Sequence, residues 1–380
     1  MGYKIKTVIA SVLKPVDDTR MYEKLGLSLL QTNRYEVNII GFVSKSPPPN
    51  KEIRFFQLFR MKRNSYKRLF ASFKLLFYFT RIQPELLILT TYEILPAALV
   101  YKFFRPRVKL VYDIQENYAL NVVSNNSHSN LSILLARGIE YLESFSQALV
   151  SLNLLAEKNY AKEIRYLAKS VVILNKYSPS KGVPNKAYEA KFAYKKESER
   201  YPVLIFSGTI SKDYGAMQSI GLVKELANLY PMLSAKFIGQ VHDKYLLKRL
   251  LNIDDSHFRF YIDSNPIPHD VIMAEMAGAD FGLVAHQPSE SIKNCFPTRI
   301  YELMALKKPI ILQNHPPWKN YCERWDACIA IDYNDYDVHW LADQIKNRTF
   351  YTRGVPDDIY WESEEIKLIK AMDGLFRLNH

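Results

Sequence analysis

Cysteine is scarce in this sequence of 380 residues. The three cysteines, Cys295, Cys322 and Cys328, are odd in number and contain no Cys-x-x-Cys spacing. Regularly paired cysteines mark secreted disulfide frameworks, and closely spaced ones mark zinc sites. The set therefore excludes both classes and predicts a cytoplasmic chain without a metal site. A late Asp-x-Asp, Asp335 to Asp337, is typical of a turn rather than of a metal-dependent transferase.

Long apolar runs are also missing. The longest, Leu69 to Phe79, contains Lys74 and is too short to span a bilayer. The amino-terminal run from Thr7 to Leu13 lacks the cleavage pattern of a signal peptide, so we interpret it as a first strand. These absences predict a protein that is soluble or attached to a membrane only at its surface.

Two functional signatures are absent. No Gly-x-Gly-x-x-Gly follows the first strand, which disfavours a dinucleotide-binding oxidoreductase. No recognised nucleic-acid fold signature is present, and we expect no nucleic-acid partner. The formal net charge of +12 still favours an anionic partner, such as a nucleotide or a phospholipid surface.

The chain itself alternates apolar strands with amphipathic helices, and its length exceeds what one core usually supports. Such alternation is typical of doubly wound parallel sheets. Among the expected elements are a helix from about Met21 to Gln31 and the strands Tyr35 to Phe42, Gln147 to Leu152 and Cys328 to Ile331. Lys, Ser, Pro and Glu without apolar periodicity fill residues 176–200, which we interpret as a linker. The predicted domains are therefore 1–175 and 201–350, followed by a terminal segment, 351–380, with a helix from Trp361 to Leu378.

One predicted helix, Arg60 to Arg81, is unusually basic and aromatic. Its cations alternate with leucine and phenylalanine, a pattern that fits an anionic bilayer surface. An ordinary core-facing helix with a solvated basic face explains the pattern equally well. The sequence leaves both interpretations open.

The stretch from Asn294 to Gln313 carries the strongest chemical signal. Pro297, a capping hydroxyl at Thr298 and an apolar stripe predict a helix starting near Pro297, which Lys307 and Lys308 end before a strand. The positive end of this helix, with the guanidinium of Arg299, is a candidate anion site. Glu302 could accept two hydrogen bonds from the hydroxyls of a ribose. A solvated Arg and a dipole-stabilised Glu remain the simpler alternative.

The block Pro-Thr-Arg-Ile-Tyr-Glu-Leu-Met-Ala and the following Lys-Pro-Ile-Ile resemble a motif of the retaining glycosyltransferases of family 4. The resemblance implies two Rossmann-like domains of the glycosyltransferase-B type facing a cleft, with the terminal helix packed on the first domain. Family members carry two donor-binding glutamates. Glu302 matches the one that contacts the ribose, whereas Asn294 replaces the one that contacts the sugar.

The same resemblance assigns further residues. For the donor, it implies contacts in a phosphate loop, around the base and at the helix tip: Gly208, Thr209, Lys212, Ile262, Asp263, Phe296, Pro297, Thr298, Arg299 and Glu302. The catalytic set is Arg299, Asn294 and Glu302. For the acceptor, it implies Asp18 and Arg20 after the first strand, and Asp113, Gln115 and Glu116 in a segment where family members carry His at the position of Gln115. Capping explains Asp18 equally well.

The function implied is transfer of a sugar, with retention, from a nucleotide-diphosphate sugar to a glycan or lipid-linked acceptor in surface polysaccharide synthesis. No cofactor and no metal are expected beyond the donor itself. Two alternatives remain: a sugar-nucleotide epimerase on the same architecture, and a catalytically degenerate binding protein, which the replacements at Asn294 and Gln115 keep open.

Overall fold

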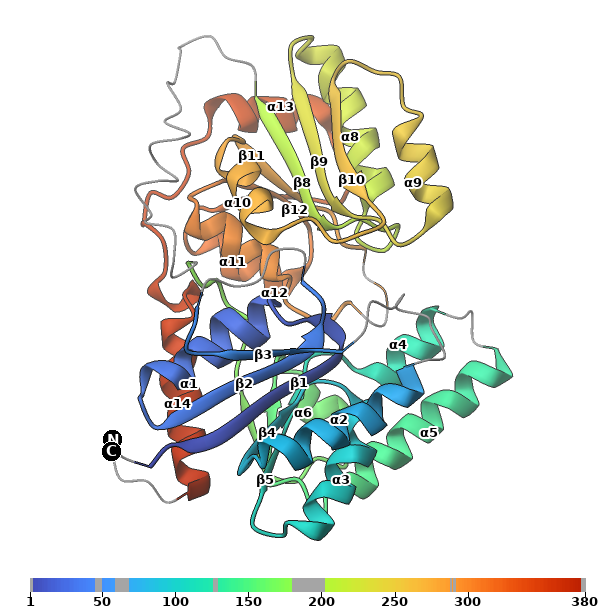
Figure 1. The fold of residues 1–380 in the computed structure, drawn as a ribbon. Coiled ribbons are helices and arrows are strands. Elements are labelled where there is room, and N and C mark those ends of the chain that lie inside the picture. Colours follow the sequence, from blue (N-terminus) through green and yellow to red (C-terminus); the bar gives the residue numbers. More distant parts are fainter. Residues whose placement is uncertain are drawn as a thin grey trace. The chain divides into compact units, whose positions relative to one another are not determined.

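A computed structural model describes residues 3–44, 50–58, 68–125, 129–179, 202–287, 289 and 292–376. The chain forms two compact units, Met1–Ser178 together with Trp361–His380, and Pro179–Tyr360 (Figure 1). Each unit contains its own parallel sheet, and the predicted fold class of two doubly wound sheets is confirmed. Residues 180–200 of the predicted linker lie outside the described residues.

The first unit is built on a seven-stranded parallel sheet in the order β3-β2-β1-β4-β5-β6-β7. The order reverses direction between β1 and β4, as in a doubly wound sheet. Its elements are β1 (Ile5–Pro15), η1 (Thr19–Gly26), α1 (Leu27–Gln31), β2 (Tyr35–Phe42), β3 (Arg54–Gln57), α2 (Arg68–Ile82), β4 (Leu86–Leu89), η2 (Tyr92–Ile94), α3 (Leu95–Phe104), β5 (Lys109–Ile114), α4 (Tyr118–Asn125), α5 (Asn130–Ser146), β6 (Leu152–Leu155), α6 (Tyr160–Glu163), β7 (Ser170–Val172) and α14 (Glu362–Phe376).

Two predicted elements of this unit differ from the structure, one in its position and one in its helix type. We expected a strand from Gln147 to Leu152, but the chain turns there, because the N–H groups of Gln147 and Leu149 bond to the carbonyls of Ser144 and Ser146 at the end of α5. An apolar run alone does not mark where pairing begins. We also expected an α-helix from Met21, whereas the chain first forms the π-helix η1.

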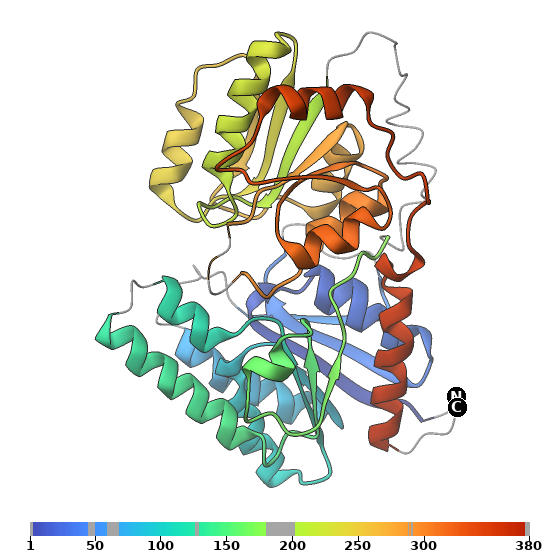
Figure 2. The same ribbon diagram turned by 180° about the vertical axis from the view of Figure 1, so that it is seen from behind.

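The terminal helix α14 belongs to the first unit and completes its core (Figure 2). Trp361 is 1% exposed, and its indole N–H donates to Ser28 Oγ at 2.9 Å. The carboxylate of Glu364 accepts from Lys176 at 2.8 Å and from the N–H of Leu174 at 3.1 Å. Burial alone would raise the pKa of Glu364, but these bonds and one from Lys367 lower it below its usual value.

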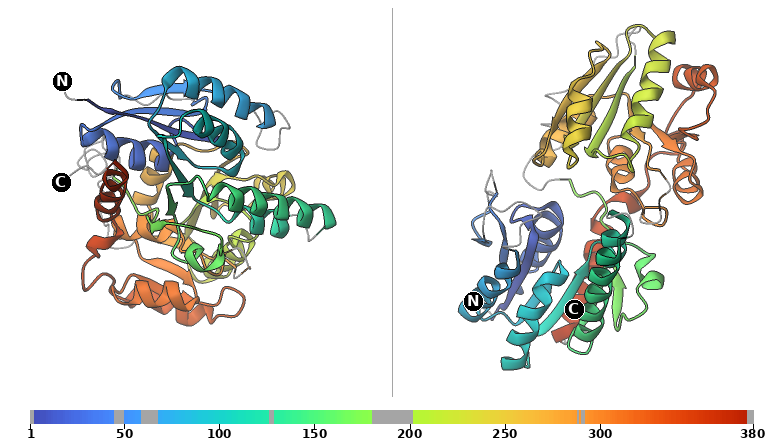
Figure 3. Two further views of the ribbon diagram at one scale, coloured as in Figure 1. Left: turned by 90° about the horizontal axis from the view of Figure 1, so that it is seen from below. Right: turned by 90° about the vertical axis from the view of Figure 1, so that its right-hand side faces the viewer.

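The second unit contains a six-stranded parallel sheet in the order β10-β9-β8-β11-β12-β13 (Figure 3). Its elements are β8 (Val203–Thr209), α8 (Ala216–Leu229), β9 (Ser234–Gln240), α9 (Lys244–Leu251), β10 (Phe258–Asp263), α10 (His269–Ala277), β11 (Phe281–Val284), α11 (Thr298–Ala305), β12 (Ile310–Gln313), α12 (Pro316–Glu323), β13 (Cys328–Ile331), α13 (Val338–Asn347) and η3 (Asp357–Ile359).

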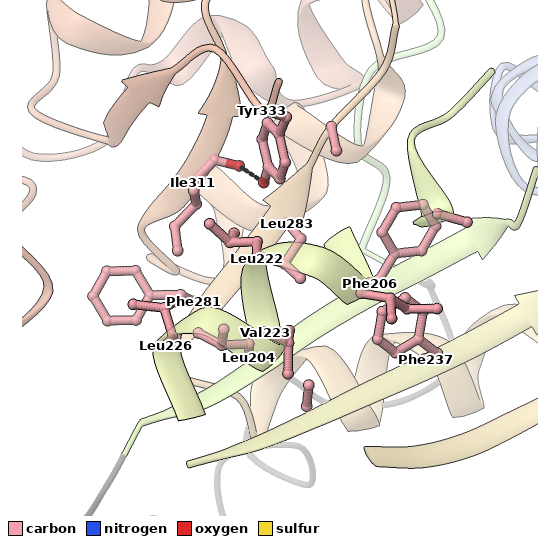
Figure 4. Close-up of a cluster of buried hydrophobic side chains, with 14 of the residues drawn as sticks. Leu204, Phe206, Leu222, Val223, Leu226, Phe237, Phe281, Leu283, Ile311 and Tyr333 are labelled. Atoms are coloured by element: carbon pink, nitrogen blue, oxygen red, sulfur yellow. Dashed lines mark hydrogen bonds between the residues drawn. The ribbon is translucent and has the colours of Figure 1, made fainter. Parts of the chain in front are cut away.

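The core of the second unit lies between this sheet and α8 (Figure 4). Phe206 and Phe237 stack with ring centroids 5.4 Å apart, and Tyr333 inserts its ring and donates its hydroxyl to the carbonyl of Ile311 at 2.8 Å. The buried polar end of Tyr333 is thus satisfied. None of the described helices combines the length and the apolar content needed to cross a lipid bilayer.

Candidate active site

The point where the strand order of the second sheet reverses lies between β8 and β11. In open α/β sheets, ligands bind outside the carboxyl ends of the strands at such a point. The loops after the two strands contact each other here. Gly215 has a φ of +77°, and a Cβ at this position would lie 2.0 Å from the carbonyl oxygen of Ala285, so only glycine fits.

Arg299 reaches this point from α11 and lies against β8. A Cβ on Gly208, whose φ is +95°, would lie 2.1 Å from Arg299 Nη2. The bare backbone of Gly208 therefore makes room for the guanidinium. Arg299 Nη1 also donates to the sulfur of Met276 at 3.3 Å. A cation is thereby held at the carboxyl edge of the sheet.

Glu302 lies one turn further along α11 and faces the same cation. Its Oε2 accepts from Arg299 Nη1 at 2.5 Å, and its Oε1 lies 3.0 Å from Nε2 of His269 on α10. The carboxylate side chain is 13% exposed. Glu302 is therefore neither solvated nor isolated, and the simpler alternative of a surface Glu and a solvated Arg is wrong.

Helix α11 begins and ends close to the predicted positions, but its two ends are capped differently from the prediction. Pro297 is the N-cap and Thr298 the first helical residue, so the Thr298 hydroxyl cannot cap the helix and no side-chain cap bond is present. At the other end, Lys307 takes a φ of +52°, and the N–H groups of Lys307 and Lys308 bond to the carbonyls of Met304 and Leu303. This left-handed cap stops the helix where expected, although it usually requires glycine.

Aromatic side chains fix the segment before α11. The indole of Trp318 donates to the carbonyl of Cys295 at 2.8 Å. Phe296 stacks on Tyr301 at 4.8 Å and meets Tyr321 edge-on at 5.2 Å. The ring of Phe296 is therefore engaged in packing, and the donor contact that the resemblance implies for this residue stays a prediction. Asn294 is exposed.

Two histidines that the sequence reasoning missed lie beside this segment. His286 follows β11 and stacks on Tyr214 at 4.5 Å, and His315 lies on the ring of Trp318 at 4.0 Å. Burial and the charge of Arg299 lower the pKa of His286 to about 3, so the ring is neutral at physiological pH. In the described structure Nδ1 of both rings is buried without a hydrogen-bond partner. His286 directly follows a predicted strand, and this position in the sequence could have marked it as a candidate site residue.

The strand register brings the other predicted donor residues to the same edge. Gly208 and Ile262 both pair with Gly239, and Thr209 and Asp263 both pair with Gln240. Thr209 and Lys212 are exposed. Asp263 Oδ1 accepts from the N–H of Asn265 at 2.7 Å and closes the turn after β10.

The residues implied for the acceptor lie in the first unit, and two of them are buried. Arg20 and Asp113 form a two-point ion pair, with Nη2–Oδ1 at 2.6 Å and Nε–Oδ2 at 2.9 Å. Arg20 is 2% exposed and Asp113 is fully buried. The guanidinium and the carboxylate bond to each other in the interior of the unit, and the acceptor contact implied for both residues stays a prediction.

The remaining acceptor-side residues are partly exposed. Gln115 Nε2 donates to Asp113 Oδ2 at 2.8 Å, so the buried ion pair orients it. Glu116 accepts from Asn121 at 3.1 Å. Asp18 accepts from the N–H groups of Arg20 and Met21, which confirms the capping interpretation.

Acidic residues late in the chain serve turns. Asp332 Oδ1 accepts from the N–H of Asn334 at 3.0 Å, and Asp337 caps α13. The turn interpretation of this segment is confirmed. Within the part of the chain that the structure describes, no three His, Cys, Asp or Glu side chains gather into a group that could hold a metal ion.

Comparison with known proteins adds evidence at the level of the fold. No protein-family model matches the chain, and no curated protein sequence matches it. Among solved structures, sucrose-phosphate synthase from Thermosynechococcus elongatus is similar with a TM-score of 0.68 and 13% identity, over 99% of this chain and 100% of that one.

Two further solved structures have a similar fold. HepE from Anabaena, in complex with UDP-glucose, has a TM-score of 0.62 at 13% identity, over 97% of this chain and 100% of that one. A Listeria monocytogenes protein to which UDP-N-acetylglucosamine 2-epimerase activity has been attributed has a TM-score of 0.60 at 9% identity, over 100% and 98%. These likenesses establish a fold of the glycosyltransferase-B type.

Proposed function

We propose that this chain is a retaining glycosyltransferase that moves a sugar from a nucleotide-diphosphate sugar to a glycan or lipid-linked acceptor in surface polysaccharide synthesis. The observation that carries the proposal is the placement of Arg299 and Glu302 at the switch point of the second sheet, with the guanidinium against the backbone of Gly208. The fold shared with HepE, whose complex holds UDP-glucose, supports the same choice of donor.

Arg299 would bind the diphosphate. A guanidinium has five N–H donors in a planar fork, so it can hold Glu302 with one edge and phosphate oxygens with another. Glu302 would accept the ribose hydroxyls, since each carboxylate oxygen has two lone pairs. His269 would hold the carboxylate of Glu302 in place while the ribose binds.

In the reaction, the bond from the anomeric carbon to the phosphate oxygen breaks, and the acceptor oxygen bonds to that carbon on the same side. The leaving diphosphate gains negative charge and can take the proton of the acceptor hydroxyl. Arg299 stabilises this charge more in the transition state than in the bound donor. Charge stabilisation by Arg299 replaces a metal in this scheme, and turnover should survive EDTA.

The acceptor would bind to the first unit through Gln115 and Glu116. Asp113 orients Gln115, and Arg20 holds Asp113. Gln115 has no titratable group, so its role is a polar contact and not general-base catalysis. Asn294 would contact the donor sugar as an uncharged hydrogen-bonding group.

The direct test is a thermal-shift screen of UDP, ADP, GDP and TDP sugars, because a ligand that binds the folded state raises its apparent stability. Donor turnover is then measured with and without candidate acceptors. Consumption that requires an acceptor and retains the anomeric configuration supports the proposal. Release of an epimerised sugar nucleotide without acceptor would establish the epimerase alternative, and binding without turnover would establish the degenerate binding protein. Absence of binding for every donor overturns the proposal.

A further inference from the structure

Helix α5 of the first unit is apolar on two opposite sides. Its inner side buries Ala136 and Ile139, whereas Tyr141 and Phe145 on the outer side are 74% and 63% exposed and stack on each other. A helix that is apolar all round is normally buried. The outer side of α5 is therefore a surface that an apolar partner would cover.

Helices α2 and α3 continue this surface. On α2, Ala71 and Leu75 are buried, and Phe77, half a turn from Leu75, is 59% exposed. Phe103 and Phe104 at the end of α3 are 76% and 73% exposed. Each of these helices turns aromatic rings toward solvent, which costs free energy unless something covers them.

The topology places the three outer sides on one surface. The connections β3-α2-β4, β4-α3-β5 and β5-α5-β6 all move in the same direction along the sheet. Right-handed crossovers therefore put α2, α3 and α5 on the same face of that sheet. Figure 1 shows the three helices together, and α3 packs against both α2 and α5. We call the set Phe73, Phe77, Phe103, Phe104, Tyr141 and Phe145 the aromatic face.

The charges around the aromatic face are almost all positive. Arg81, Arg105, Arg107 and Arg137 are exposed on these helices and the turn after α3. Glu140 is the one exposed carboxylate on the described parts of the same helices. If a second copy of the chain packed on this face with two-fold symmetry, the arginines of the two copies would lie close together and repel each other. An anionic surface would instead neutralise them.

We infer that the aromatic face binds the surface of an anionic lipid bilayer. Phenylalanine and tyrosine enter the boundary of headgroups and acyl chains, while the arginines bind acidic headgroups. This surface reaches beyond the helix predicted from Arg60 to Arg81, whose cations Lys62, Arg63 and Lys67 lie outside the described residues. The inference does not depend on the donor site in the second unit.

The test is co-sedimentation with vesicles of phosphatidylcholine, with and without 30 mol% phosphatidylglycerol. We expect binding to the acidic vesicles, with loss at high salt, because charges near a surface are screened. The double variant Arg105→Gln/Arg107→Gln should reduce partitioning about 25-fold, since each cation near such a surface is worth about fivefold. Tyr141→Ser/Phe145→Ser should also abolish most binding.

Two control variants remove exposed apolar side chains elsewhere on the protein. Ile366 on α14 and Tyr245 on α9 are each 71% exposed and lie outside the aromatic face, so Ile366→Ser and Tyr245→Ser should bind vesicles like the wild type. All variants should keep the thermal transition of the wild type, which shows that they fold. Equal binding to neutral vesicles, equal loss in the controls, or no vesicle binding would each overturn the inference. A wild-type dimer in light scattering that the Tyr141→Ser/Phe145→Ser variant loses, without vesicle binding, would show that a second copy covers the face.

Discussion

Nε2 of His269 lies 3.0 Å from Oε1 of Glu302, and the two residues come from different helices. The opposite oxygen of the same carboxylate bonds to Arg299. Both oxygens of Glu302 are thus oriented before any ligand arrives. A pre-oriented carboxylate loses less conformational freedom on binding, which favours affinity.

Glu302→Ala should weaken nucleotide binding by ~1.5–3 kcal/mol, the scale of hydrogen bonds to a charged group. Calorimetric titration with the identified nucleotide measures the loss. A nucleotide that lacks both ribose hydroxyls should bind the wild type and the variant equally. Glu323→Gln on the exposed side of α12 serves as a control and should change nothing. Unchanged affinity in folded Glu302→Ala would remove the ribose assignment.

Loss of the Arg299 guanidinium should lower kcat more than it lowers the affinity for the donor. We expect Arg299→Ala to lower kcat by about two to three orders of magnitude, the range for one lost electrostatic contact in a transition state. Arg299→Lys should recover part of it, because the charge survives without the planar fork. Steady-state kinetics with the identified donor and acceptor provide the measurement, and wild-type kcat in Arg299→Ala would mean that the diphosphate binds elsewhere.

A methyl group at Gly208 should displace that cation without removing it. Gly208→Ala places a Cβ 2.1 Å from Arg299 Nη2 and forces alanine into a left-handed conformation that costs roughly 1–2 kcal/mol. We expect lower kcat and a lower unfolding temperature. Gly221 lies within α8 with open space around it, and Gly221→Ala should stabilise the protein by about 0.5–1 kcal/mol. Normal kcat in Gly208→Ala would show that the guanidinium need not lie on the strand.

The neutral ring of His286 should make the second unit sensitive to acid. Its pKa is about 3 when folded and about 6.5 when unfolded, so between these values the unfolded chain binds one more proton. This contribution to stability is present above pH 6.5 and falls by up to about 1.4 kcal/mol per pH unit below it. Urea unfolding at pH 7.5 and 5.5 measures the slope. His286→Phe should flatten it, whereas His339→Gln, at an exposed position, should keep it; an identical slope in both variants would contradict the assignment.

Patterns that repeat along the chain predicted the fold well. The alternation of strands and helices gave both sheets, and β2 and β13 have the bounds expected from their apolar runs. These bounds were predictable because a strand buried on both faces of a parallel sheet appears in the sequence as a continuous apolar run. The same local view placed β6 too early, because the residues after α5 form a hydrogen-bonded turn in which Leu149 is exposed.

The candidate site was predictable where its residues are close in sequence. Arg299 and Glu302 share one helix, so their spacing alone brings them together. Gly208 was expected there only from the family resemblance. His269 reaches Glu302 from α10, and only the three-dimensional structure reveals this contact. The burial of Asp113 likewise depends on Arg20, which lies 93 residues away. Motif spacing carries no information about such a partner.

The return of α14 to the first unit has a consequence for synthesis of the chain. Trp361, Leu368 and Met372 belong to the same core as Ile5 and Ile9. The residues of the first sheet therefore leave the ribosome long before the residues that complete its core are synthesised. During that interval the nascent first unit exposes apolar surface, which is what chaperones bind. A stop codon after Tyr360 would leave the first unit permanently in this state, so we expect truncated chains to be degraded even though they contain every residue of the proposed donor site.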